Sequence, residues 1–145
     1  MTRWIILPVL IGIVLVAACS SGIGIGANSP GDGATRQLEF AAAGQWTEVW
    51  NELHPQQQRA VSLEAFLACH DRDAQPAENI EIDDERKQKL EVPEIGTVTS
   101  YEVTLTYDTD GQSATYTTRE ISVDNEWRWV LDQVAINAYN AGRCP

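Results

Sequence analysis

The spacing of hydrophobic residues predicts helices in the first half of the chain. From Ala34 to Leu53, apolar side chains recur at steps of three and four residues, as on one face of a helix. Gly44 interrupts this pattern and predicts a kink or two short helices. His54-Pro55 ends it, because the residue before a proline avoids helical backbone angles. After a further turn over 56–61, Ser62 is the expected N-cap of another helix. That helix carries Leu63, Phe66, Leu67 and His70.

The second half of the chain changes to the alternating pattern of strands. Between Tyr101 and Tyr107, apolar residues alternate with polar ones, as in a strand that is buried on one face. Asp110-Gly111 predicts a hairpin turn into a partner strand over 113–123. Asp124-Asn125 predicts a second turn into a third strand. The third strand carries Trp127, Trp129 and Leu131.

A further strand is expected within 80–92, where Pro93 and Gly96 then break the pattern. The chain therefore places helices first and an antiparallel meander after them. This order predicts an α+β domain with its helices packed on one face of a curved sheet.

The uncharged run over 4–18 predicts a targeting segment. It is too short to span a bilayer, which takes about 20 apolar residues, and with Arg3 before it, it predicts a secretory signal peptide over 1–18. Val16-Ala17-Ala18-Cys19 resembles the lipobox of bacterial lipoproteins. The resemblance implies cleavage before Cys19, a diacylglyceryl group on its thiol, and an extracytoplasmic protein that a lipid anchors to the membrane. An ordinary signal peptide with a coincidental cysteine, or an uncleaved anchor, is the alternative.

Gly, Ser, Asn and Pro dominate the stretch after the lipobox and predict a flexible tether over 19–33, ahead of a domain over 34–145. Gly22, Gly24 and Gly26 resemble a dinucleotide-binding loop only in their letters, because such a loop follows a strand inside a βαβ unit. We therefore expect no cofactor.

Two cysteines remain once Cys19 is assigned to the lipid. Cys69 and Cys144 are an even pair in an oxidising compartment, which predicts a disulfide between them. That bond would hold the C-terminus on the domain. The formal net charge of −11, with no basic patch, argues against nucleic acid as a partner.

Two segments resemble NTF2-like domains. "AAAGQWTEVWNELHP", which ends at Pro55, resembles their opening helices, and "VDNEWRWVL", from Val123 to Leu131, resembles their last hairpin and strand. The chain is also similar in its cysteines to secreted actinobacterial lipoproteins of this type. The resemblance implies a cone over 34–145, in which a bent sheet wraps a long helix and leaves a pocket at its open end. Asn125 stands where such domains usually have a glycine.

Two stretches resemble metal sites in part. "CHDRD", from Cys69 to Asp73, cannot bring adjacent residues of a helix onto one ion, and zinc needs ligands from at least two segments. Asp108 to Gly111 shares letters with a calcium loop, but Arg119 stands where the loop's bidentate glutamate belongs. A solvated helix end and a hairpin turn explain the two stretches, so no metal is expected.

Aromatic residues are the candidates for a pocket. They are Trp46, Trp50, Tyr101, Tyr107, Trp127 and Trp129. The tryptophans among them more often belong to an apolar core than to a pocket. An enzyme needs a titratable group inside the pocket. Depending on strand register, Tyr101, Tyr107, Tyr116, His70 and Asp132 are the residues that would point inward. His54, beside a proline, is expected to cap a helix.

These patterns predict a non-enzymatic, lipid-anchored protein that acts as an interaction module in the cell envelope, with an envelope protein as its partner. Binding of a small apolar ligand or lipid in the cone is the alternative. An isomerase or hydrolase is the second alternative. An open apolar cavity would favour the ligand, and a filled cone would favour the interaction module.

Overall fold

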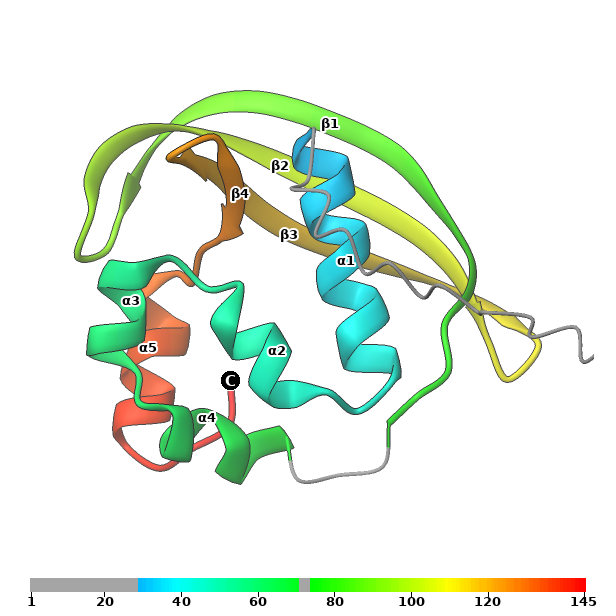
Figure 1. Ribbon diagram of the computed structural model, residues 1–145, viewed down its shortest axis with the longest axis horizontal. Coiled ribbons are helices and arrows are strands. Elements are labelled where there is room, and N and C mark those ends of the chain that lie inside the picture. The colour runs from blue at the N-terminus through cyan, green and yellow to red at the C-terminus, as the bar shows by residue number, and fades with distance from the viewer. Residues whose placement is uncertain (1–28, 71–73) are drawn as a thin grey trace, which may run out of the picture.

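A curved antiparallel sheet with helices on its concave side forms the part of the chain that the computed structural model describes, residues 29–70 and 74–145. The sheet has the strand order β1-β2-β3-β4, so each strand pairs with its neighbour in the chain. This arrangement confirms the α+β class (Figure 1). The elements are α1 (Pro30–Ala42), α2 (Trp46–Asn51), α3 (Pro55–Ala60), α4 (Leu63–His70), β1 (Glu78–Val92), β2 (Gly96–Thr109), β3 (Gln112–Val123), β4 (Glu126–Trp129) and α5 (Gln133–Asn140).

Short polar turns connect the later strands, as predicted. Asp110 and Gly111 join β2 to β3 with φ angles of 50° and 74°, and Asp124 and Asn125 join β3 to β4 with 52° and 66°. Asp, Asn and Gly tolerate this left-handed backbone, and two such residues in a row match the twist of the flanking strands. The turn at Asn125 therefore forms without a glycine.

Helix α1 begins earlier than the sequence pattern predicts. The Ser29 hydroxyl accepts from the Asp32 backbone N–H, and the Asp32 carboxylate accepts from the Ser29 N–H, which together form a capping box. Pro30 occupies the first helical position, where its fixed φ suits a helix. The expected boundary between tether and domain at 33/34 is therefore wrong, because the residues from Pro30 to Gly33 are the first turn of the helix.

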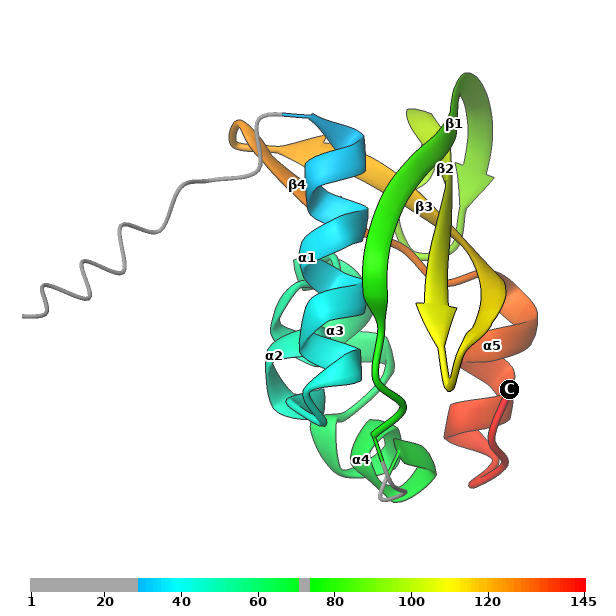
Figure 2. The ribbon, with the colours of Figure 1, turned by 90° about the vertical axis from the view of Figure 1, so that its right-hand side faces the viewer.

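Helix α1 lies against the concave face of the sheet (Figure 2), and its backbone comes close to strand residues at Gly33. A Cβ atom on Gly33 would lie 2.9 Å from the Cβ of Trp127 and 3.0 Å from Oε2 of Glu120. Only a residue without a side chain fits this spacing.

The remaining helices close one end of the sheet. Helix α2 follows a break at Gly44, as predicted, and α3 and α4 begin at Pro55 and Leu63, directly after His54 and Ser62. The His54 ring accepts from the Gln56 N–H, which confirms its role as a cap, and the Ser62 hydroxyl accepts from the Ala65 N–H. The apolar core at this end contains Val49, Leu53, Val61, Phe66, Trp129, Leu131, Ile136 and Tyr139.

The C-terminal segment differs from the sequence-based expectation. Strand β4 ends at Trp129, so Leu131 lies outside it, and the chain then forms α5. The Asp132 carboxylate accepts from the Ala135 N–H at 2.8 Å and starts this helix. The expected order, with every helix ahead of the strands, is therefore wrong.

A disulfide joins the two halves of this helical end. Cys69 at the end of α4 and Cys144 near the C-terminus are bonded, with their Cα atoms 5.2 Å apart, as a disulfide requires. This pairing confirms the prediction. Cys19 lies outside the described residues.

Candidate ligand-binding pocket

A pocket of about 480 Å³ lies between the C-terminal half of α1, the sheet, and helices α2, α4 and α5. Its walls are mostly apolar, with two alanines of α1 and aromatic rings of the other elements among the lining residues. The apolar lining consists of Leu38, Ala41, Ala42, Trp46, Val49, Phe66, Cys69 and Trp129. Ligand sites in proteins commonly measure about 300–1,000 Å³ and are lined in this way.

A hydrogen-bonded pair of polar residues faces this pocket from two helices. Nε2 of His70 in α4 and the hydroxyl oxygen of Tyr139 in α5 lie 2.9 Å apart. Trp46 stacks on the His70 ring with 4.6 Å between ring centroids, and the Phe66 ring lies 4.4 Å away on centroids. The imidazole is thus held in one orientation by two aromatic rings and one hydroxyl.

Burial favours the uncharged forms of three titratable groups in the pocket, His70, Tyr116 and Tyr139. Burial lowers the pKa of His70 below its usual value of 6.5, because an apolar surrounding disfavours the charged imidazolium. Burial raises the pKa of Tyr139 to about 12 and that of Tyr116 further above its usual range. The pocket therefore presents a neutral imidazole and neutral phenols to a bound molecule.

The remaining polar lining residues are two amides and one phenol. They include Gln37 from α1, which is 3% exposed, and its amide oxygen has no hydrogen-bond partner among the described residues. Gln75, beyond the end of α4, and Tyr107 at the end of β2 complete the polar part of the lining.

The structure brings together half of the aromatic residues that the sequence suggested for a pocket. Trp46, Tyr107 and Trp129 line it. Trp50 instead donates from its indole N–H to the Val61 carbonyl. Tyr101 and Trp127 pack edge to face on each other, with 5.2 Å between ring centroids, and do not line the pocket.

Some of the residues considered as acids or bases line the pocket, and others do not. His70, Tyr107 and Tyr116 line the pocket, whereas Tyr101 does not and Asp132 caps α5. Sequence reasoning did not identify Gln37, Phe66 or Tyr139 as pocket residues. The sequence does contain a signal for Tyr139. Asp132 is a suitable N-cap, and Ile136 and Tyr139 follow it with the three-residue spacing of one helix face.

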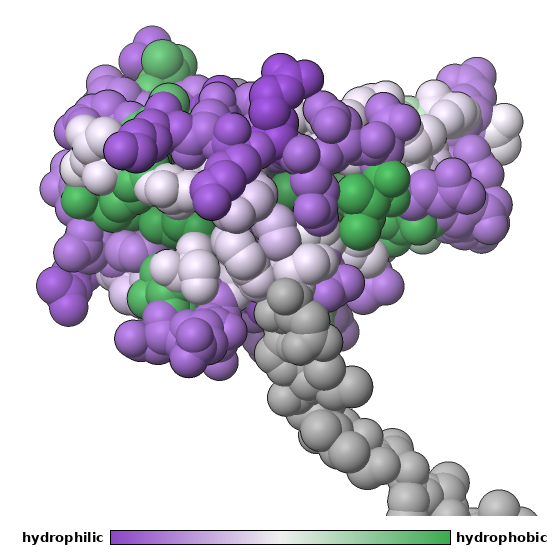
Figure 3. All heavy atoms as spheres, turned by 90° about the horizontal axis from the view of Figure 1, so that it is seen from above, coloured by the Kyte–Doolittle hydropathy of each residue, from purple (hydrophilic) through white to green (hydrophobic). Residues whose placement is uncertain are grey.

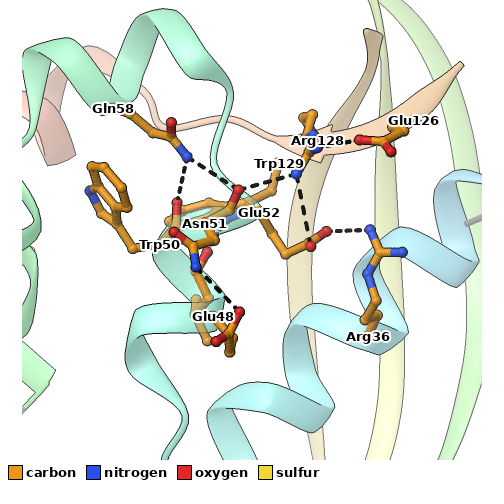
Figure 4. Close-up of polar contacts among 10 residues, drawn as sticks. Arg36, Glu48, Trp50, Asn51, Glu52, Gln58, Glu126, Arg128 and Trp129 are labelled. Atoms are coloured by element: carbon orange, nitrogen blue, oxygen red, sulfur yellow. Dashed lines mark hydrogen bonds and ion pairs between the residues drawn. The ribbon is translucent and has the colours of Figure 1, made fainter. Parts of the chain in front are cut away.

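A second polar cluster lies outside the pocket, between α1, α2 and β4 (Figure 4). Arg36 pairs with Glu52, and Oε1 of Glu52 lies 3.8 Å from Nη1 of Arg128, which also pairs with Glu126. This chain of ion pairs connects α1 to β4.

Glu120 in β3 lies next to this cluster and is 1% exposed. Its Oε1 atom has no hydrogen-bond partner in the described part of the chain. Burial, and after it the nearby Glu52 carboxylate, raise the pKa of Glu120 well above its usual value, while Arg36 acts in the opposite direction. The pairing of Tyr101 with Glu120 and of Glu120 with Trp129 places all three on one rung of the sheet.

No helix within 29–70 and 74–145 is long and apolar enough to cross a membrane. Asp71 to Asp73, part of the stretch considered for a metal, lie outside the described residues. A comparison of the chain with protein-family models gave no match, and a comparison with curated proteins gave none.

Proposed function

We propose that the protein binds a small apolar molecule in the pocket between α1, the sheet and helices α2, α4 and α5. The volume of about 480 Å³ with mostly apolar walls is the observation that carries this proposal. A folded domain normally fills such a space with its own side chains, since interiors are packed as densely as organic crystals. The same arrangement, a long helix in a curved sheet with an open end, supports our assignment of an NTF2-like cone.

The pocket is a better-supported site than a surface that docks a partner. Ile82 on β1 and Val134 on α5 are the large hydrophobic residues exposed in the described part of the chain. Figure 3 looks at the molecule from above and shows hydrophilic residues over most of this face, with separate small hydrophobic patches between them. An interaction module would present a contiguous apolar patch of several hundred Å², so we rank this function second.

We further propose that a lipid on Cys19 anchors this binding domain outside the cytoplasm. The support is the sequence alone: the apolar run, the small residues Ala17 and Ala18, and the cysteine after them. Cys19→Ala should release the protein from the membrane fraction or leave the precursor uncut. Normal processing with unchanged membrane retention would contradict the anchor.

Blocking the pocket tests the binding proposal directly. Ala42→Phe places a large ring in the cavity, because Ala42 lines it, whereas Ala43→Phe places the same ring one residue later on an exposed position outside the lining. Organic extracts of the protein purified from its native envelope should contain a molecule that Ala43→Phe retains and Ala42→Phe loses, at equal melting temperatures. Equal ligand content in the two variants would contradict the proposal.

The His70–Tyr139 hydrogen bond favours an enzyme of isomerase or hydrolase type as a further candidate. A neutral imidazole can take a proton from a substrate, and a phenol can donate a hydrogen bond to the charge that develops. If the protein converts the ligand that is extracted with it, His70→Phe should abolish turnover. The ligand content of this variant should stay within about threefold of that of the unmodified protein. Turnover that persists in His70→Phe would exclude this candidate.

A further inference from the structure

The pocket has no charged lining residue among the residues that the structure describes. Its polar groups are amides, phenols and one imidazole, and none of them carries a charge that would balance an anion or a cation at neutral pH. The chain as a whole has a formal net charge of −11, which further disfavours an anion. An ionised ligand group would lose its water here without gaining an opposite charge, which is costly.

Gln37 differs from the other buried glutamine, Gln57. The Gln57 side chain makes three hydrogen bonds: its amide donates to the carbonyls of Pro93 and Leu131 at 3.1 and 3.0 Å, and it accepts from the Leu131 N–H at 2.7 Å. The Gln37 oxygen, which is equally enclosed, has no protein donor in the described chain. Buried polar atoms in folded proteins nearly always have a partner.

The position of Gln37 identifies where that missing donor would come from. Gln37 lines the pocket together with Leu38, Ala41 and Ala42 on the same helix. A bound molecule that fills the apolar space between these residues and the aromatic wall therefore lies beside the amide. The oxygen itself is enclosed, so the Gln37 amide must turn toward the pocket before a ligand hydroxyl can donate to it. An ether or a hydrocarbon offers no donor, so the oxygen would stay unpaired beside it.

From these observations we infer that the ligand is an uncharged apolar molecule with a hydroxyl group that donates to the Gln37 amide oxygen. This inference rests on the proposed function and adds the charge and the polar group of the ligand. It distinguishes alcohols from fatty acids and other anionic lipids, which share the apolar part and differ in the head.

Three probes of equal chain length separate these possibilities: decan-1-ol, its methyl ether and decanoate. Trp46 and Trp129 line the pocket, so their fluorescence reports binding to the purified protein. At pH 8 the alcohol should bind about tenfold more tightly than the ether, which leaves a buried acceptor unpaired. Decanoate should bind more than about a thousandfold more weakly than the alcohol, because a carboxyl group is almost entirely ionised at pH 8 and must take up a proton to enter the uncharged pocket. Its affinity should rise about tenfold for each unit that the pH falls from 8 to 7.

Gln37→Leu removes the acceptor and keeps the side chain's approximate size. In this variant the alcohol and the ether should bind equally, so the ratio falls from about ten to about one. Gln56→Leu is the matched control, because Gln56 is exposed on α3 and does not line the pocket. It should keep the ratio of the unmodified protein.

Each result has a distinct meaning. Decanoate that binds at pH 8 as tightly as the alcohol, or an alcohol preference that persists in Gln37→Leu, overturns the inference and leaves the pocket as a binding site. Failure of all three probes to bind, in a protein whose extracts also contain no ligand, overturns the proposed function and this inference with it.

Discussion

Nε2 of His70 lies 2.9 Å from the hydroxyl oxygen of Tyr139, although the two residues are 69 positions apart in the chain. The bond joins α4 to α5 inside the pocket, where Phe66 touches both rings, with centroid distances of 4.4 and 5.6 Å. It therefore links the position of the C-terminal helix to the shape of the cavity.

This hydrogen bond should be measurable as a coupling energy. Tyr139→Phe removes the hydroxyl, and His70→Phe keeps an aromatic ring on Trp46 but removes the nitrogen. Each variant should lose about 1 kcal/mol of unfolding free energy, and the double variant should lose less than the sum, with a coupling of about 1 kcal/mol. Urea unfolding of the four proteins at pH 7.5 gives the cycle. Additive losses would show that the two groups do not interact.

Glu120 should make the protein less stable as the pH rises. Its folded pKa is raised above the unfolded value, so the folded state holds the proton more tightly. The stabilisation that this gives is complete below about pH 4.5 and is lost as the pH rises through the folded pKa. Glu120→Gln should therefore be more stable than the unmodified protein at pH 7, because the glutamine is neutral without binding a proton.

Unfolding free energies of the two proteins between pH 4.5 and 8 test this expectation, and the difference should vanish at the acid end. Burial lowers the pKa values of His54 and His70, so their contributions to stability vary with pH in the direction opposite to that of Glu120. Both proteins contain these histidines, so subtracting one unfolding free energy from the other removes their contributions. Glu64→Gln, at an exposed position on α4, is the control and should change little. A Glu120→Gln variant that is less stable at pH 7 would contradict the assignment.

Gly33 should not tolerate alanine, in spite of its place in a helix. Alanine normally stabilises a helix by up to about 1 kcal/mol relative to glycine. At position 33 the new Cβ would meet the Trp127 Cβ at 2.9 Å, an atom fixed to the backbone. We expect Gly33→Ala to lose about 1–3 kcal/mol, as overpacked sites do.

Gly31 is the matched comparison in the same helix. An added Cβ there would meet the ends of the Glu85 and Ile82 side chains, which can move away. Gly31→Ala should therefore cost less than Gly33→Ala in thermal unfolding, even though it disturbs the 2.8 Å hydrogen bond from the Gly31 N–H to Glu85. The reverse order would show that α1 does not approach the sheet as described.

The Cys69–Cys144 disulfide should supply a large share of the stability. It closes a loop of 75 residues, and the chain-entropy model gives about 4 kcal/mol for a loop of this length. Replacing both cysteines by serine should lower the unfolding free energy by up to this amount. Intact mass before and after reduction checks the bond itself. Two thiols that react with an alkylating reagent without prior reduction would contradict it.

Local signals in the sequence predicted most of the elements. Gly44, Ser62 and the two turns at Asp110-Gly111 and Asp124-Asn125 act through backbone angles and neighbouring N–H groups, so no distant contact is needed to recognise them. The start of α1 at Pro30 is also local, since Ser29 and Asp32 form its cap. The glycines around this cap led to the expectation of a tether.

Only the tertiary structure decided which side chains form the site. Tyr101 and Tyr107 share one face of β2, and the sequence treats them alike. Yet α1 crosses the sheet so that Tyr107 faces the pocket while Tyr101 packs on Trp127. Trp46 and Trp50 both lie on the short helix α2, but Trp46 lines the pocket whereas Trp50 donates a hydrogen bond to the Val61 carbonyl.

The sequence by itself determined the order of helices and strands up to β4, the turns and the pairing of two cysteines, because short-range geometry and residue counting control them. The pocket, the contact of His70 with Tyr139 and the burial of Glu120 depend on how α1 and α5 pack against the sheet. Those packing positions are set by the sum of many distant contacts, such as the close approach at Gly33, and no local pattern in the chain encodes them.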